Sequence, residues 1–150
     1  MKHTIGATVL LVLMMTVVGS LSCQTSPEEE AKRQLDSLVD RWSGALVEEE
    51  IEGIVSCYWD NAVSMNYWPG EESEMEQGSA EIRASAVKGF EELDYGSMGF
   101  IWDETVRFFP EGGNPVYIRP VSSHGFMDVF EFEERGDEYR IIRHYVLPHP

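Results

Sequence analysis

Cysteine and basic residues are scarce in this chain of 150 residues, which has 2 Cys and 11 Lys and Arg against 27 Asp and Glu. Because Cys23 lies near the N-terminus, the body of the chain holds Cys57 alone, and a disulfide that staples the domain is excluded. The formal net charge of −16 repels nucleic acid and anionic lipid headgroups, so we expect neither as a partner. The 4 His residues lack the spacing of a metal-binding motif, and we expect no metal and no cofactor.

Long apolar runs are also missing, apart from one near the N-terminus. Residues 5–18 are apolar or small and follow Lys2, and this run is shorter than the roughly 20 residues that cross a bilayer. The pattern is typical of a secretory signal peptide. We therefore expect residues 1–22 to be a signal peptide that is removed before Cys23.

Two processing routes fit the residues before this cysteine. The sequence Gly-Ser-Leu-Ser-Cys at 19–23 resembles a bacterial lipobox, which implies that Cys23 is acylated and that the protein touches a membrane of the cell envelope only through this lipid anchor. In such lipoproteins the residue after the Cys directs sorting, and Gln24, in place of Asp, implies that the protein is anchored in the outer membrane and faces the periplasm. Ser20 and Ser22 also satisfy the small-x-small rule of ordinary signal peptidase, whose product is soluble, secreted or periplasmic. We favour the lipid anchor.

The first half of the remaining chain predicts helices. Residues 24–30 are expected to be a short linker and residues 31–150 one domain, in which 43% hydrophobic content over this length suffices for a core. Ser26 and Glu29 form the pattern of a capping box, and apolar residues then recur at helical spacing up to Leu46. A second helix is expected from Ile51 to Tyr58, ended by Asp60 and Asn61, and a third begins at Ser79.

The rest of the chain predicts strands. Residues 62–68 alternate as one strand, residues 69–78 form an acidic loop, and after Gly96 the period changes from 3.6 to about 2. Strands are expected at 100–109, 115–121, 125–133 and 139–147, separated by Gly, Pro, Asn and Asp residues that are typical of turns. The order predicts an α+β fold, with three N-terminal helices packed on one face of a curved antiparallel sheet.

Three short motifs occur in this frame. They are Y-x-D-x-A-V at 58–63, G-x-x-x-I-R at 78–83, and the hairpin FEFEERGDEYRIIRH at 130–144. Their order and spacing resemble the NTF2-like superfamily over residues 31–147, with its SnoaL-like and ketosteroid-isomerase-like branches most similar. The resemblance implies a cone-shaped roll. This fold hosts enzymes, binding proteins and assembly modules, many of them homodimers, so it does not by itself assign a function.

The resemblance also locates three catalytic positions of the ketosteroid isomerases. It places Trp42 where those enzymes have a Tyr, Asn66 at their first Asp and Asp128 at their second. An Asn side chain cannot take a proton from carbon, and an indole is a poor acid. We therefore do not expect the isomerase mechanism to operate here.

Asp128 nevertheless lies in an aromatic strand, between Phe126 and Phe130. Burial in an apolar cup would make its carboxyl group either a protonated hydrogen-bond donor or a base poised near neutral pH. We expect Asn66 to be its polar partner. The alternative is that Asp128 faces solvent or pairs with Arg140 or Arg143.

The candidate ligand site is therefore a pocket between helices and sheet. It would be lined by Trp42, Tyr58, Asn66, Trp68, Trp102 and Asp128, although each aromatic residue could equally belong to the core. His124 and His144 are candidates for acid or base, or for structural hydrogen bonding.

These residues leave two classes of function open. One is a non-catalytic module that binds a small, mostly apolar molecule or forms a homodimer, and the loss of two of the three isomerase positions favours it. The other is a SnoaL-like isomerase, dehydratase or cyclase that uses Asp128 and a His for proton transfer. A second titratable group within hydrogen-bond reach of Asp128 would favour the enzyme.

Overall fold

The computed structural model describes residues 26–67 and 73–149, and the chain divides into two compact units, residues 1–32 and 33–150. In the first unit the described part is Ser26 and the first turns of helix α2 (Pro27–Val47). The predicted capping box is present: the Glu29 N–H donates to Ser26 Oγ at 3.1 Å, and the Ser26 N–H donates to Glu29 Oε2 at 3.0 Å. Residues 27–30, expected to lie in a linker, are therefore helical. The signal peptide and Cys23 lie outside the described residues.

The second unit contains the rest of α2 and two further helices, α3 (Ile51–Val55) and α4 (Ser79–Glu92). The predicted apolar stripe of α2 is buried, including Leu35, Leu38 and Trp42. Helix α4 packs against α3 and against the outer strands of the sheet. The N-cap residue of α4 is Gly78, and no side chain caps this end of the helix. The φ of Gly78 is 86°, a backbone conformation that favours glycine. No helix in the described part of the chain is long and apolar enough to cross a membrane.

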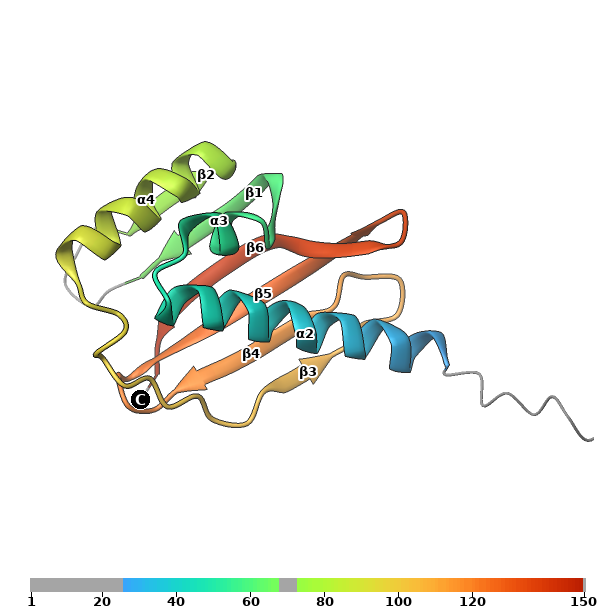
Figure 1. Ribbon diagram of the computed structural model, residues 1–150. Helices are drawn as coiled ribbons and strands as arrows, with labels where there is room; N and C mark the ends of the chain where they lie inside the picture. The colour runs from blue at the N-terminus through green and yellow to red at the C-terminus, as the bar shows by residue number, and fades with distance from the viewer. Residues whose placement is uncertain (1–25, 68–72, 150) are drawn as a thin grey trace, which may run out of the picture. The chain divides into compact units, whose positions relative to one another are not determined.

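The sheet has six strands in the order β2-β1-β6-β5-β4-β3 (Figure 1). All neighbouring strands are antiparallel except β1 and β6, which are parallel. The strands are β1 (Tyr58–Asn66), β2 (Glu74–Gln77), β3 (Val106–Phe108), β4 (Val116–Val121), β5 (Phe126–Arg135) and β6 (Glu138–Pro148).

The predicted α+β class is confirmed, and four details of the prediction were wrong. The sheet is mixed, because alternation identifies a strand but carries no information about the direction of its neighbour. Asp60 and Asn61 do not end a helix but lie inside β1, where the register with β6 shifts between Tyr58 and Val63. Of the expected strand at 100–109 only Val106–Phe108 pairs with a neighbour, whereas Glu74–Gln77, expected to be a loop, pairs with β1.

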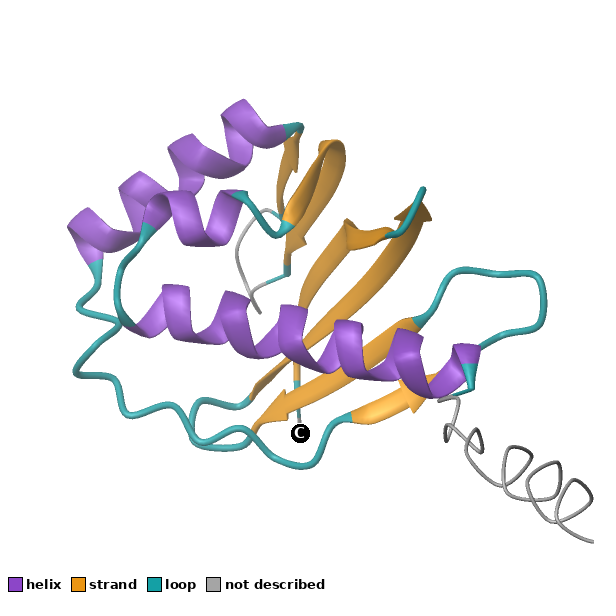
Figure 2. Ribbon diagram, turned by 45° about the vertical axis from the view of Figure 1, so that its right-hand side comes forward, coloured by secondary structure: helices purple, strands orange, loops and turns teal. Residues whose placement is uncertain are grey.

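The helices of this unit cover one face of the sheet, as Figure 2 shows. The core lies between the two layers, and Tyr117, Phe130 and Phe132 are its largest fully buried side chains. Trp42 of α2 meets Phe130 of β5 edge to face, with ring centroids 5.1 Å apart. This contact fixes the height of α2 above the strand that carries Asp128.

Candidate functional site

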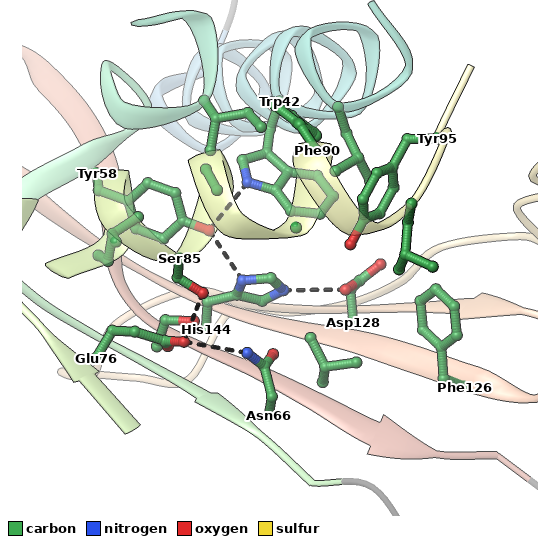
Figure 3. Close-up of a pocket in the computed structure, with 18 of the residues that line it drawn as sticks. Trp42, Tyr58, Asn66, Glu76, Ser85, Phe90, Tyr95, Phe126, Asp128 and His144 are labelled. Atoms are coloured by element: carbon green, nitrogen blue, oxygen red, sulfur yellow. Dashed lines mark hydrogen bonds and ion pairs between the residues drawn. The ribbon is translucent and has the colours of Figure 1, made fainter. Parts of the chain in front are cut away.

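A cavity of about 180 Å³ lies between the sheet and the helices of the second unit. Most of its wall is apolar, and six aromatic residues contribute to it: Trp42, Tyr58, Phe90, Tyr95, Phe100 and Phe126. The polar part of the wall comes from six residues: Ser64, Asn66, Glu76, Ser85, Asp128 and His144. Figure 3 shows Asn66, Glu76, Asp128 and His144 below the rings of Trp42, Phe90 and Tyr95.

Four buried side chains form a continuous hydrogen-bonded network at this wall. Trp42 Nε1 lies 2.9 Å from the Tyr58 hydroxyl, this hydroxyl lies 2.9 Å from His144 Nδ1, and His144 Nε2 lies 3.0 Å from Asp128 Oδ1. All four residues are at most 5% exposed. The second titratable group that would favour an enzyme is therefore present, and it is His144.

The Trp42 indole fixes the direction of the whole network because it is a donor only. Its N–H donates to the Tyr58 oxygen, and among the described residues the Tyr58 hydroxyl proton has one acceptor, His144 Nδ1. His144 is then the neutral tautomer protonated at Nε2, which donates to Asp128 Oδ1. Asp128 is thus the acceptor at the end of the network, a role that suits a carboxylate.

Tyr58 holds its proton firmly in this position. Burial raises the pKa of Tyr58 well above its ordinary value, more than the hydrogen bond from Trp42 lowers it, and the charge of Asp128 adds to the rise. The phenol therefore stays neutral, and its O–H donates to His144 Nδ1. The network is a fixed support for Asp128, whose second oxygen points away from His144 (Figure 3).

The sheet topology brings these side chains together. Asp128 and Phe130 point to the same face of β5, and His144 is the partner of Phe130 on β6. The imidazole stacks on the Phe130 ring with centroids 4.6 Å apart and an interplanar angle of 12°. Because diagonal neighbours in a sheet remain within reach of long side chains, His144 extends from its position beside Phe130 to Asp128.

The expected burial of Asp128 is confirmed, whereas the expected partner Asn66 and the alternative of solvent or an arginine are wrong. Asp128 is 2% exposed and does not face solvent. Its partner is His144, whereas Asn66 donates to Glu76 Oε1 at 3.3 Å. The two arginines form salt bridges with other residues: Arg140 with Glu138 at 2.8 Å and Arg143 with Glu131 at 2.7 Å.

Sequence reasoning missed Glu76, the second carboxylate of the cavity wall. Glu76 is 8% exposed. Its Oε1 accepts hydrogen bonds from Ser85 Oγ at 2.9 Å and from Asn66 Nδ2, but its Oε2 has no hydrogen-bond partner among the described residues. The signal was weak, because Glu74-Met75-Glu76-Gln77 alternates over only four residues inside an acidic stretch.

Two other predicted site residues, Trp102 and His124, do not line this cavity. Trp102 stacks with Phe100 at 5.4 Å and carries the Arg119 guanidinium 4.9 Å from its ring centroid. His124 lies 2.7 Å from the Ser123 hydroxyl, at Nδ1, on the turn before β5. Trp68 lies outside the described residues. Of the predicted set, the structure therefore brings together Trp42, Tyr58, Asn66, Asp128 and His144.

Two further chemistries find no support in the described residues. No group of three His, Cys, Asp or Glu side chains in residues 26–67 and 73–149 could hold a metal ion. Cys57 is fully buried, and burial raises the pKa of its thiol although Arg41 opposes the rise. A protonated, inaccessible thiol is a poor nucleophile, so Cys57 belongs to the core.

Comparison with known proteins identifies the fold. No protein-family model and no curated protein matches the chain by sequence. Solved structures do match: an NTF2-like protein of unknown function from Silicibacter pomeroyi has a TM-score of 0.63 and 13% identity over 81% of this chain and 98% of its own. A cystatin-like protein from Nostoc punctiforme gives 0.62 and 10% over 79% and 91%, and a ketosteroid isomerase-like protein from Erwinia carotovora atroseptica gives 0.57 and 12% over 76% and 92%. The chain therefore has the NTF2-like fold, as the sequence resemblance implied.

Proposed function

We propose that the cavity binds a small, mostly apolar molecule and that Asp128 accepts a hydrogen bond from its polar end. The observation that carries this proposal is the network itself: three side chains are committed to holding one carboxylate in an apolar wall. A buried carboxylate loses its solvation, which is unfavourable unless bound groups replace the water. His144 binds Oδ1 of Asp128, and a donor on a ligand could bind the second oxygen.

The size of the cavity limits this ligand. About 180 Å³ is close to the roughly 150 Å³ of an apolar cavity that accepts benzene. It is below the roughly 300–1,000 Å³ of sites for drug-sized ligands. We therefore infer a molecule built around a single ring or a chain of similar volume.

Proton transfer at Asp128 is the second candidate, and the 3.0 Å contact with His144 favours it. In this function the carboxylate removes a proton from the ligand, and the His144 N–H holds Asp128 in position and steadies its charge. The step differs from that of the ketosteroid isomerases, because the Trp42 N–H is already donated to Tyr58 and Asn66 is bonded to Glu76. One structural neighbour is called ketosteroid isomerase-like, which lends this candidate support by analogy alone.

Native mass spectrometry of the protein recovered from a bacterial expression host tests the binding function. We expect a small-molecule adduct on the wild type that is lost in Asp128→Asn, which keeps the side-chain size and removes the charge. Asp137→Asn makes the same change on the exposed turn between β5 and β6 and should keep the adduct. An adduct that survives in Asp128→Asn would contradict the role of Asp128, and a bare wild type that also ignores added benzyl alcohol would contradict the function.

The remaining sequence predictions stay proposals. We propose a lipid-anchored protein of the cell envelope, on the strength of Cys23 and the residues before it. A homodimer also stays a proposal, and the same mass spectra would report it directly. Neither affects the argument for the cavity, whose lining belongs to the second unit.

A further inference from the structure

Glu76 is a buried carboxylate that the protein leaves half satisfied. Two neutral donors, Asn66 on β1 and Ser85 on α4, bind Oε1 and fix the side chain between strand and helix. Oε2 is buried and has no hydrogen-bond partner among the described residues, although Glu76 is 8% exposed and lines the cavity. Such a group is unfavourable in the empty protein, so its position needs a reason.

The cavity offers this carboxylate no positive charge. None of the described residues that line it is Lys or Arg, and the wall holds a second carboxylate, Asp128. The cations on the nearest helix pair elsewhere, Arg83 with Glu52 and Lys88 with Glu74. His144 lies between the two carboxylates in Figure 3 and is neutral in the network derived above. Arg119, the cross-strand neighbour of Asp128, interacts with the charge of Asp128 but does not line the cavity. The lining itself therefore presents two carboxyl groups and no Lys or Arg.

Aromatic rings add to this preference on the opposite side of the cavity. Phe90 meets Tyr95 edge to face at 5.4 Å, and Tyr95 stacks with Phe100 at 6.0 Å. Ring faces attract cations, and the attraction grows when the site excludes water. A site with two carboxylates on one side and aromatic rings on the other suits a ligand that carries a positive charge on an apolar group.

We propose that the ligand of this cavity is a small organic cation, a protonated amine on a ring-sized apolar group, and that Glu76 Oε2 accepts its N–H. The proposal rests on the binding function above and names the class of ligand. Asp128 accepts from a second donor on the same molecule or from the same ammonium group. Anionic ligands fit this site poorly, because they would meet two carboxyl groups in a lining without Lys or Arg.

A matched pair of probes tests the charge. Benzylamine and benzyl alcohol have nearly the same size, but only the first is a cation at neutral pH. We expect the wild type to bind benzylamine at least tenfold more tightly by ligand-observed NMR titration, which equals about 1.4 kcal/mol. Glu76→Gln keeps the volume and the acceptor for Asn66 and Ser85, and it should lose this preference while binding benzyl alcohol as before.

Glu74→Gln is the matched control, because Glu74 is exposed two residues away on the same strand. It removes the same charge and should keep the tenfold preference. Equal binding of both probes by the wild type, or a preference that persists in Glu76→Gln, would overturn the inference and leave the binding function standing. If neither probe binds the wild type, the binding function is wrong and the inference falls with it. Should Glu76→Gln fail to fold, Ser85→Ala, which releases the carboxylate, should weaken benzylamine selectively.

Discussion

Replacing Tyr58 by Phe removes one oxygen atom and should break the network at its centre. The Trp42 N–H and His144 Nδ1, which both bond to this hydroxyl at 2.9 Å, would lose their partner together. Each buried polar group left unpaired costs about 1–3 kcal/mol. Since the four side chains are at most 5% exposed, water cannot readily replace the hydroxyl. We expect the free energy of unfolding to fall by about 2–4 kcal/mol.

Urea unfolding followed by tryptophan fluorescence would measure this loss. With a slope of about 1–3 kcal/mol per molar urea, the midpoint should move down by roughly 1–2 M. Tyr139→Phe is the control: its hydroxyl donates to Glu134 at 3.1 Å on the surface, and its loss should change stability by less than about 0.5 kcal/mol. Equal effects of the two variants would refute the network, and with it the assignment of Asp128 as a fixed acceptor.

Two further predictions concern charge and processing. Burial alone would raise the pKa of Glu131, but hydrogen bonds from Arg143 and Asn114 outweigh it and lower this pKa below its ordinary value of 4.5. The ionised Glu131 therefore stabilises the folded protein above pH 4.5, and this contribution is lost as the pH falls through the lowered pKa. Urea unfolding between pH 3 and 6 should therefore show that Glu131→Gln loses less stability on acidification than the wild type does. The difference should be less than about 1 kcal/mol, because Arg143 is half exposed. Cys23→Ser should release the protein from the envelope fraction in cell fractionation, and an unchanged membrane fraction would contradict the lipid anchor.

Much of the fold could be predicted because its signals are local. The capping box at Ser26 and the stripe of α2 depend on residues three and four apart, and both were found. The place of Asp128 on the inner face of β5 followed from alternation with its Phe neighbours. What alternation could not supply was the direction of β1 against β6, which depends on the whole path of the chain.

The polar partners could not be predicted because they depend on register. Asp128 and His144 lie on two strands, β5 and β6, whose register shifts between Glu131 and Phe132. No local sequence pattern predicts such a register shift. Glu76 was missed for a related reason. Glu74 and Glu76 are the same residue type on the same short strand, and only the helix above Glu76 makes one of them buried.

The parallel pair of β1 and β6 has a consequence for the order in which the protein folds. It pairs Tyr58 with Ile141 and Asn66 with Val146, which lie far apart in the sequence. Forming this pair therefore closes a long stretch of chain, which costs conformational entropy. Contacts of such long range slow folding and postpone it until the last strand is available. During synthesis the pairing of β1 with β6 therefore waits until β6 has been made. His144, which orients Asp128, lies on β6, so the site is complete only once this strand has paired.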